Sequence, residues 1–172
     1  MPEMQTAALR DSRILCLISA SAANTETIGA ALGRRLPPGA VVCLSGALGA
    51  GKTVFSRGIG AGWGAVPPLT SPTYNLVHQH RRARDDGQLA HIDLYRIGGT
   101  ADADTLGLDD LLDSAYIVIM EWPERVGDLL PPAHLWIDIE WLNDDKRELV
   151  FRARGPRHAA LLDALRRDLA AS

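Results

Sequence analysis

Hydrophobic and polar positions follow two different periods along the chain, and together they predict a mixed α/β protein. The runs at 41–44 and 116–120 are wholly apolar, as expected for strands buried on both faces of a sheet. A first strand is expected at 13–18. Between it and the run at 41–44, apolar residues recur every four positions from 28 to 36, which predicts a helix. The opening of the chain therefore indicates strand, helix and strand in succession.

The later part of the chain predicts two antiparallel pairs. The segments 75–80 and 89–93 have strand character and are joined by a polar turn, so a hairpin is expected. The segments 134–141 and 147–154 alternate apolar and polar residues around an Asn-Asp-Asp turn, so they form a late antiparallel pair. Further helices are expected at 106–112, 123–130 and 156–171. Another helix is expected to follow residue 53 and to end in the glycine-rich segment 58–64.

Composition is that expected of one soluble globular domain over residues 1–172, with a loose polar lead-in at 1–12. The chain is 47% hydrophobic, which is enough for one well-buried core. No apolar run approaches the ~20 residues that cross a bilayer, and the N-terminus lacks the pattern of a secretion signal, so no membrane association is expected. Cys16 and Cys43 lie in apolar strand-like runs, which favours free thiols and a cytoplasmic protein.

The charge of the chain argues against direct binding of nucleic acid. A formal net charge of -3 and an isoelectric point near 5.9 provide no broad positive field for a phosphate backbone. Arg81, Arg82 and Arg84 form a small basic cluster, but two aspartates follow it, which is typical of a solvated turn. DNA binding is therefore not expected, and any RNA is expected to be held by a partner protein.

Residues 46–53 satisfy the phosphate-binding pattern G-x-x-x-x-G-K-[ST], and they lie between a buried strand and a helix as that motif requires. The glycines allow backbone N–H groups to face a phosphate, and the helix N-terminus adds partial positive charge. Lys52 adds a full charge, and the Thr53 hydroxyl is placed to bind Mg²⁺. We expect a P-loop NTPase-like, three-layer α/β fold with a mixed, largely parallel central sheet. The nucleotide-binding residues expected in the loop are Gly46, Ala47, Leu48, Gly49, Ala50, Gly51, Lys52 and Thr53.

Phosphate-loop enzymes also need a carboxylate close to Mg²⁺, usually at the carboxyl end of a strand beside the loop. Asp93 and Glu121 both end apolar runs. We expect Glu121 to be the metal-side carboxylate, acting through water, because its strand has the composition of a central, doubly buried strand. Asp93 is then expected to position or activate the attacking water, or to hold a water further from the metal.

Four motifs in one order resemble the bacterial TsaE (YjeE) family. They are the loop at 46–53, Ser-Pro-Thr-Tyr at 71–74, His-Ile-Asp-Leu-Tyr-Arg at 91–96 and Glu-Trp-Pro-Glu at 121–124. The family comprises the ATPases of tRNA threonylcarbamoyladenosine biosynthesis. The resemblance implies binding of ATP and Mg²⁺ with slow intrinsic hydrolysis. It also implies work in a complex with TsaB-like and TsaD-like proteins, in which TsaD modifies adenosine 37 of tRNA, so that tRNA is reached through the complex.

The resemblance also implies roles for individual residues. One departure is Ala47, where many relatives carry an acidic residue; because that position contributes mainly backbone, the change concerns local tuning of the loop. The residues that match family positions are Lys52 and Thr53 for phosphate and Mg²⁺, Thr73 as a switch-like residue near the terminal phosphate, and Asp93, Glu121 and Trp122 in the active site.

Two other functions are compatible with the motifs. A small-molecule kinase of the P-loop class would use the same loop, but it needs an acceptor site and usually an arginine-bearing lid, which the sequence does not identify. A nucleotide-gated binding subunit would need occupancy by ATP and no turnover. The fate of the γ-phosphate distinguishes these two from a hydrolysing subunit.

Overall fold

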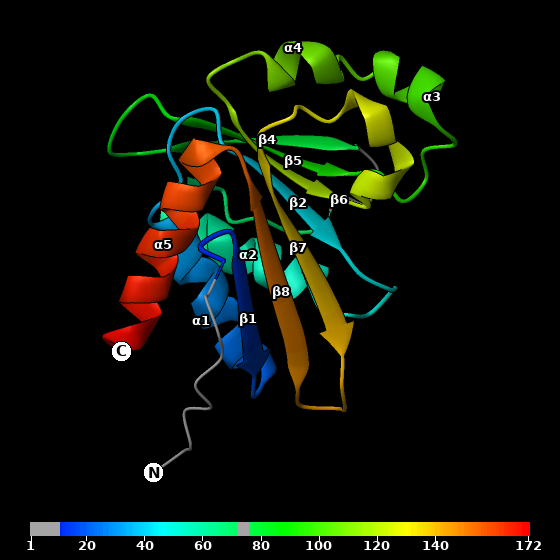
Figure 1. The fold of residues 1–172 in the computed structure, drawn as a ribbon. Helices are drawn as coiled ribbons and strands as arrows, with labels where there is room; N and C mark the ends of the chain where they lie inside the picture. Colours follow the sequence, from blue (N-terminus) through cyan, green and yellow to red (C-terminus); the bar gives the residue numbers. More distant parts are fainter. Residues whose placement is uncertain (1–10, 72–75) are drawn as a thin grey trace.

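One mixed sheet organises the part of the chain that the structure describes. The structure is a computed structural model, and it describes residues 11–71 and 76–172. Within them lies an eight-stranded sheet of order β1-β8-β7-β2-β6-β5-β4-β3 (Figure 1). The strands are β1 (Ile14–Ser19), β2 (Val41–Ser45), β3 (Ala65–Val66), β4 (Val77–Arg82), β5 (Gln88–Asp93), β6 (Ile117–Glu121), β7 (His134–Trp141) and β8 (Arg147–Arg154).

The sheet is parallel at its centre and antiparallel on both sides. β2 pairs in parallel with β6 and with β7, and β5 pairs in parallel with β6. β4 and β5 form the expected hairpin, and β7 and β8 form the expected late antiparallel pair. The predicted mixed α/β fold class is confirmed, but the expectation of a largely parallel sheet is wrong. Four pairings are antiparallel, and parallel pairing joins only the four central strands β7, β2, β6 and β5. Their carboxyl ends meet at one edge of the sheet, where ligands bind in open α/β folds.

Helices cover both faces of the sheet and make the three layers (Figure 1). On one face lie α1 (Ala22–Gly33), α2 (Lys52–Trp63) and α5 (Pro156–Ala170). On the other lie α3 (Thr100–Asp104), α4 (Leu108–Leu112) and the short 3₁₀ helices η1 (Pro123–Arg125) and η2 (Gly127–Leu129). A separate apolar core fills each interface. Successive side chains of β2 alternate between them, with Val42 and Leu44 in one core and Val41 and Cys43 in the other.

Two predicted helices differ from the observed structure. The helix expected at 106–112 is present as α4, which starts two residues later, and the preceding helix α3 was not predicted. Gly107 interrupts the chain between them with a φ of 67°. The segment at 123–130 was expected to be one helix and forms η1 and η2 instead, with Gly127 at a φ of 33°. In both places glycine takes a left-handed backbone conformation that does not continue a helix.

Two glycines of the helix after the phosphate loop, Gly58 and Gly62, face α1. A Cβ added at Gly29 of α1 would lie 2.6 Å from the backbone oxygen of Phe55 in α2, and Gly33, Gly58 and Gly62 make comparably close backbone approaches. Small residues therefore let the two helix backbones pack directly together. α2 ends at Trp63, within the predicted segment, and Gly64 caps it with a φ of 92°. This packing fixes the helix whose first residues are Lys52 and Thr53.

Candidate nucleotide-binding site

The phosphate loop connects the end of β2 to the start of α2. Gly46, Gly49 and Gly51 have φ values of 156°, 78° and 114°, all in the region that favours glycine. A Cβ at Gly46 would also lie 2.5 Å from the backbone oxygen of Ile139 in β7, so this position needs glycine for space as well. The result is the left-handed loop geometry of a phosphate cradle, held directly at the N-terminus of a helix.

Lys52 folds back over this loop. Its Nζ donates to the backbone oxygens of Gly46 at 2.6 Å and Ala47 at 2.9 Å, and it lies 4.3 Å from the ring centre of Trp122. Lys52 is 5% exposed. Burial lowers the pKa of Lys52, and the carboxylates of Glu121, Glu124 and Asp93 oppose that shift. An ammonium group has three protons, so two hold the loop in shape and one is left for an anionic ligand.

A cavity of about 640 Å³ opens beside the loop. Most of the predicted site residues meet there, although they come from β2–α2, β5 and β6. Gly46, Ala47 and Ala50 belong to the loop but do not line the cavity, and Thr73 lies outside the described residues. The lining residues are Leu48, Gly49, Gly51, Lys52, Thr53, Val54, Ser71, Leu76, Asp93, Tyr95, Arg96, Glu121 and Trp122.

Asp93 and Glu121 are direct neighbours across the β5–β6 pair. Both therefore end at the carboxyl edge of the parallel strands, next to the loop that leaves β2. The Oδ1 atom of Asp93 accepts a hydrogen bond from the backbone N–H of Tyr95 at 2.9 Å. Burial raises the pKa of Asp93, and the charge of Glu121 adds to the rise, while the Tyr95 hydrogen bond opposes it. The site thus holds one half-buried carboxyl that is easier to protonate than usual.

Glu121 is the more deeply buried of the two carboxylates, at 3% exposure. Its Oε1 atom lies 2.9 Å from Nε2 of His91 in β5 and 3.1 Å from Oγ of Ser56 in α2. Both partners are fully buried. A buried carboxylate needs hydrogen-bond donors of this kind, because it has lost the water that would otherwise solvate it.

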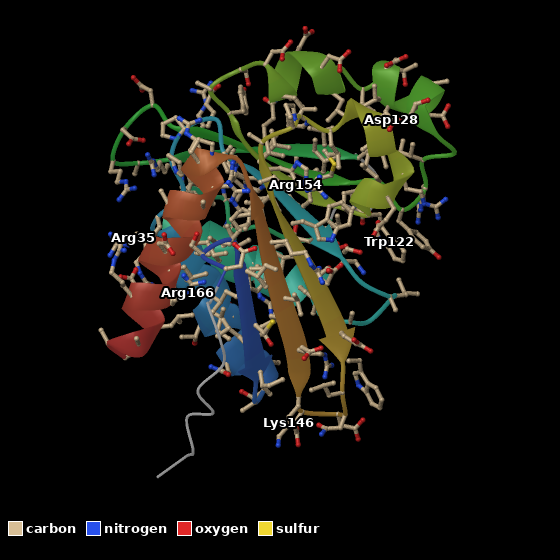
Figure 2. All side chains as sticks on the ribbon, viewed as in Figure 1. Arg35, Trp122, Asp128, Lys146, Arg154 and Arg166 are labelled. Atoms are coloured by element: carbon tan, nitrogen blue, oxygen red, sulfur yellow. The ribbon has the colours of Figure 1, made fainter. Side chains whose placement is uncertain are left out.

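Trp122 follows Glu121 in an unusual backbone conformation, with φ 60° and ψ 49°. Non-glycine residues in this region cost on the order of 1–3 kcal/mol, and they cluster at functional sites. The backbone N–H of Trp122 donates to the oxygen of Leu44 in β2 at 3.2 Å, and its ring centre lies 5.0 Å from that of Tyr95. Figure 2 shows Trp122 near the carboxyl end of β2. The strained turn therefore places an aromatic wall against Lys52.

Several cavity and supporting residues were not assigned from the sequence. Tyr95 and Arg96 follow Asp93 within the same six-residue motif, and this was the available signal for them. Ser56 lies one helical turn after Lys52, on the side of α2 that faces β6, and nothing in the sequence alone pairs it with Glu121. Ser71 and Leu76 also line the cavity.

The oxygen donors of this site suit a small, hard cation. Thr53 supplies a hydroxyl, and Glu121 and Asp93 supply carboxylates, which are the ligand types that Mg²⁺ prefers. Within residues 11–71 and 76–172 no group of three or more histidine, cysteine, aspartate or glutamate side chains could hold a metal by itself. Mg²⁺ at nucleotide sites is bound by one or two protein groups together with phosphate oxygens and water, so the residues fit that kind of site.

Among the described residues, no helix is long and apolar enough to span a bilayer.

A mixed α/β sheet with a glycine-rich loop between a buried strand and a helix, and carboxylates at the ends of neighbouring strands, defines the class of P-loop nucleotide-binding proteins. The model of the family described as "Threonylcarbamoyl adenosine biosynthesis protein TsaE" matches residues 19–149. The chain belongs to the TsaE family, whose role lies in the biosynthesis of threonylcarbamoyladenosine in tRNA.

Individual relatives show the same similarity. The chain is 36% identical over 132 residues to the TsaE protein of Bacillus subtilis, covering 76% of this chain and 80% of that protein. It is 37% identical over 133 residues to TsaE of Treponema pallidum, covering 77% of this chain and 96% of that protein. The crystal structure of YdiB from Bacillus subtilis matches with a TM-score of 0.75 and 30% identity, over 90% of this chain and 95% of that one.

Proposed function

We propose that this protein binds ATP with Mg²⁺ and hydrolyses it slowly, as the ATPase subunit of tRNA threonylcarbamoyladenosine modification. The proposal is supported chiefly by one observation: Lys52, Thr53, Asp93 and Glu121 line the same cavity. These side chains supply a cation for phosphates, a hydroxyl and two carboxylates, which is the set of groups that phosphoryl transfer to water requires.

Each residue of the site is proposed to have its own role in binding or hydrolysis. Backbone N–H groups of the loop and the N-terminus of α2 hold the phosphates, and Lys52 neutralises part of their charge. Thr53 and Glu121 would hold Mg²⁺, which supplies charge neutralisation at the phosphate oxygens when bound. Asp93 orients the attacking water, and Trp122 with Tyr95 shields one side of the site. Catalysis then rests on positioning and electrostatics, with no covalent intermediate on the protein.

The output of hydrolysis is a conformational change in a partner complex. The family's role in tRNA modification and the negative net charge of this chain favour partners that hold the tRNA themselves. We propose TsaB-like and TsaD-like proteins as these partners, in the cytoplasm. The segment 71–74 begins at Ser71 on the cavity wall, so its order is proposed to depend on the terminal phosphate.

The test follows the γ-phosphate of labelled ATP in the purified protein, alone and with TsaB-like protein, TsaD-like protein and tRNA. We expect slow release of inorganic phosphate that requires Mg²⁺ and is accelerated by the complex. Transfer of the label to a small molecule would identify a kinase, and retention of the label during assembly would identify a nucleotide-gated subunit. Either result overturns the ATPase proposal.

A second measurement addresses the conformational output. The rate of hydrogen exchange in the segment 71–74 is measured in two states, one with ADP bound and one with a non-hydrolysable ATP analogue bound. We expect slower exchange with the analogue. Equal exchange in the two states would remove this segment as the switch and leave the ATPase proposal standing.

A further inference from the structure

Glu121 is held by a buried histidine that the proposed chemistry does not itself use. His91 and Glu121 lie on adjacent parallel strands, and the register pairs Glu121 with Asp93, two residues beyond His91. Alternation along β5 therefore places His91 on the same face of the sheet as both carboxylates. His91 is fully buried and does not line the cavity, so it reaches the site through Glu121.

The second donor near Glu121 cannot replace His91. The hydroxyl of Ser56 lies 2.9 Å from the backbone oxygen of Lys52 and 3.1 Å from Oε1 of Glu121. A hydroxyl has one proton, so it cannot donate fully to both acceptors. The backbone oxygen is the nearer one. His91 is then the main donor to Oε1 among the described residues.

The tautomer of His91 follows from its two ring nitrogens. Nε2 lies 2.9 Å from the Glu121 carboxylate, which can only accept when it is ionised. Nδ1 is buried and has no hydrogen-bond partner among the described residues. A proton on Nδ1 would be a buried donor with nothing to bind, so the hydrogen bonding assigns the proton to Nε2.

We propose that His91 is a positioning residue for the metal-side carboxylate. By binding Oε1, it fixes the rotation of the Glu121 carboxylate and leaves the other oxygen, Oε2, for an ion that the cavity would hold. This inference rests on the proposed function, because it gives Glu121 its role at Mg²⁺. Outer groups that orient metal-binding side chains contribute strongly to metal affinity.

The test measures how strongly Mg²⁺ enhances the binding of ADP to the full chain. ADP affinity is determined by calorimetry in EDTA and again at saturating Mg²⁺, and the ratio of the two affinities reports the contribution of the ion. His91→Leu removes the donor. We expect it to reduce the ratio about tenfold or more and to leave the affinity in EDTA within about threefold of the wild type.

Two variants separate positioning from packing. His91→Gln keeps an N–H close to the place of Nε2, and we expect it to restore most of the Mg²⁺ enhancement. His80→Leu removes another buried strand histidine, which is 4% exposed and bonded to the backbone oxygen of Pro67, so it should leave the ratio unchanged. Thermal unfolding checks that each variant is folded. If His91→Leu does not fold, His91→Asn, whose amide lies closer to the place of Nδ1, is compared with His91→Gln.

Three results would overturn the role of His91. The first is a His91→Leu variant in which Mg²⁺ enhances ADP binding as much as in the wild type. The second is a folded His91→Gln variant that loses as much of this enhancement as His91→Leu. The third is a wild-type protein whose ADP affinity does not respond to Mg²⁺. None of these measurements needs turnover. A wild-type protein that responds to Mg²⁺ but releases no phosphate from ATP would contradict the proposed ATPase activity and leave the assignment of His91 intact.

Discussion

Replacing Lys52 with methionine removes one charge from the centre of the site with little change in shape. Methionine has a similar length and suits a position that is 5% exposed. The change deletes the hydrogen bonds from Nζ to the oxygens of Gly46 and Ala47 and the contact with the Trp122 ring. It also removes the cation that faces the phosphates.

The structure predicts a small effect on stability and a large effect on nucleotide binding. Burial lowers the pKa of Lys52, which shows that its surroundings do not fully compensate the ammonium for lost water. Losing the two hydrogen bonds is therefore offset by losing a buried charge, and the free energy of unfolding without nucleotide should change by less than about 1.5 kcal/mol. A charge-assisted bond to phosphate contributes about 1.5–3 kcal/mol, so ADP affinity should fall by about 10–150-fold.

Thermal and chemical unfolding with and without ADP measure both effects in one experiment. At an ADP concentration one hundred times the dissociation constant, binding stabilises the wild type by about 2.7 kcal/mol. A variant that binds one hundred times more weakly gains only about 0.4 kcal/mol at the same concentration. Lys146→Met is the matched control, since Lys146 is the other lysine of the chain and lies exposed in the turn between β7 and β8 (Figure 2).

Two outcomes would refute this reasoning. If the Lys52→Met variant binds ADP within about threefold of the wild type, Lys52 does not contact the phosphates as the loop geometry implies. If it loses more than about 3 kcal/mol of stability without nucleotide, the ammonium is mainly a structural group that holds the loop, and its hydrogen bonds outweigh the burial of the charge.

Three further predictions concern the same architecture. Glu121→Gln should lower Mg²⁺-dependent phosphate release by about 100-fold or more and keep ADP affinity in EDTA, as measured by turnover and calorimetry; wild-type turnover would remove Glu121 from the metal side. Because burial raises the pKa of Asp93, turnover should fall as the pH is lowered through that raised value and the carboxylate is protonated, and a flat profile of kcat against acidic pH would exclude Asp93 from catalysis. Gly33→Ala should destabilise the protein by about 1–3 kcal/mol in denaturant unfolding, because its Cβ would meet the backbone of Ile59; an unchanged midpoint would show that α1 and α2 can separate at little cost.

The sequence was most informative where local chemistry is specific. The loop at 46–53 could be recognised from its glycines, Lys52 and Thr53, because a phosphate cradle needs those residue types in that order. The central strands could be recognised because a strand with helices on both faces has to be apolar on both sides. The family followed from the order of the four motifs, and the match over residues 19–149 confirms it.

Helix boundaries were harder to predict because packing overrides local preference. Glycines ordinarily weaken a helix, but Gly58 and Gly62 are accommodated in α2 because α1 approaches so closely that a Cβ at either position would collide with the α1 backbone. Gly107 sets the start of α4 and Gly127 divides the helix predicted at 123–130, because their backbone is left-handed. Composition alone does not distinguish these two uses of glycine.

By itself the sequence determined the class of ligand, the family and the two carboxylates worth considering. Only the tertiary structure decided their surroundings. It placed Asp93 and Glu121 side by side through the β5–β6 register, and buried Glu121 against His91 and Ser56. The physical reason is that a motif specifies residues close together in the chain. The contacts that orient Glu121 join β5, α2 and β6, which become neighbours only when the sheet and its helices assemble.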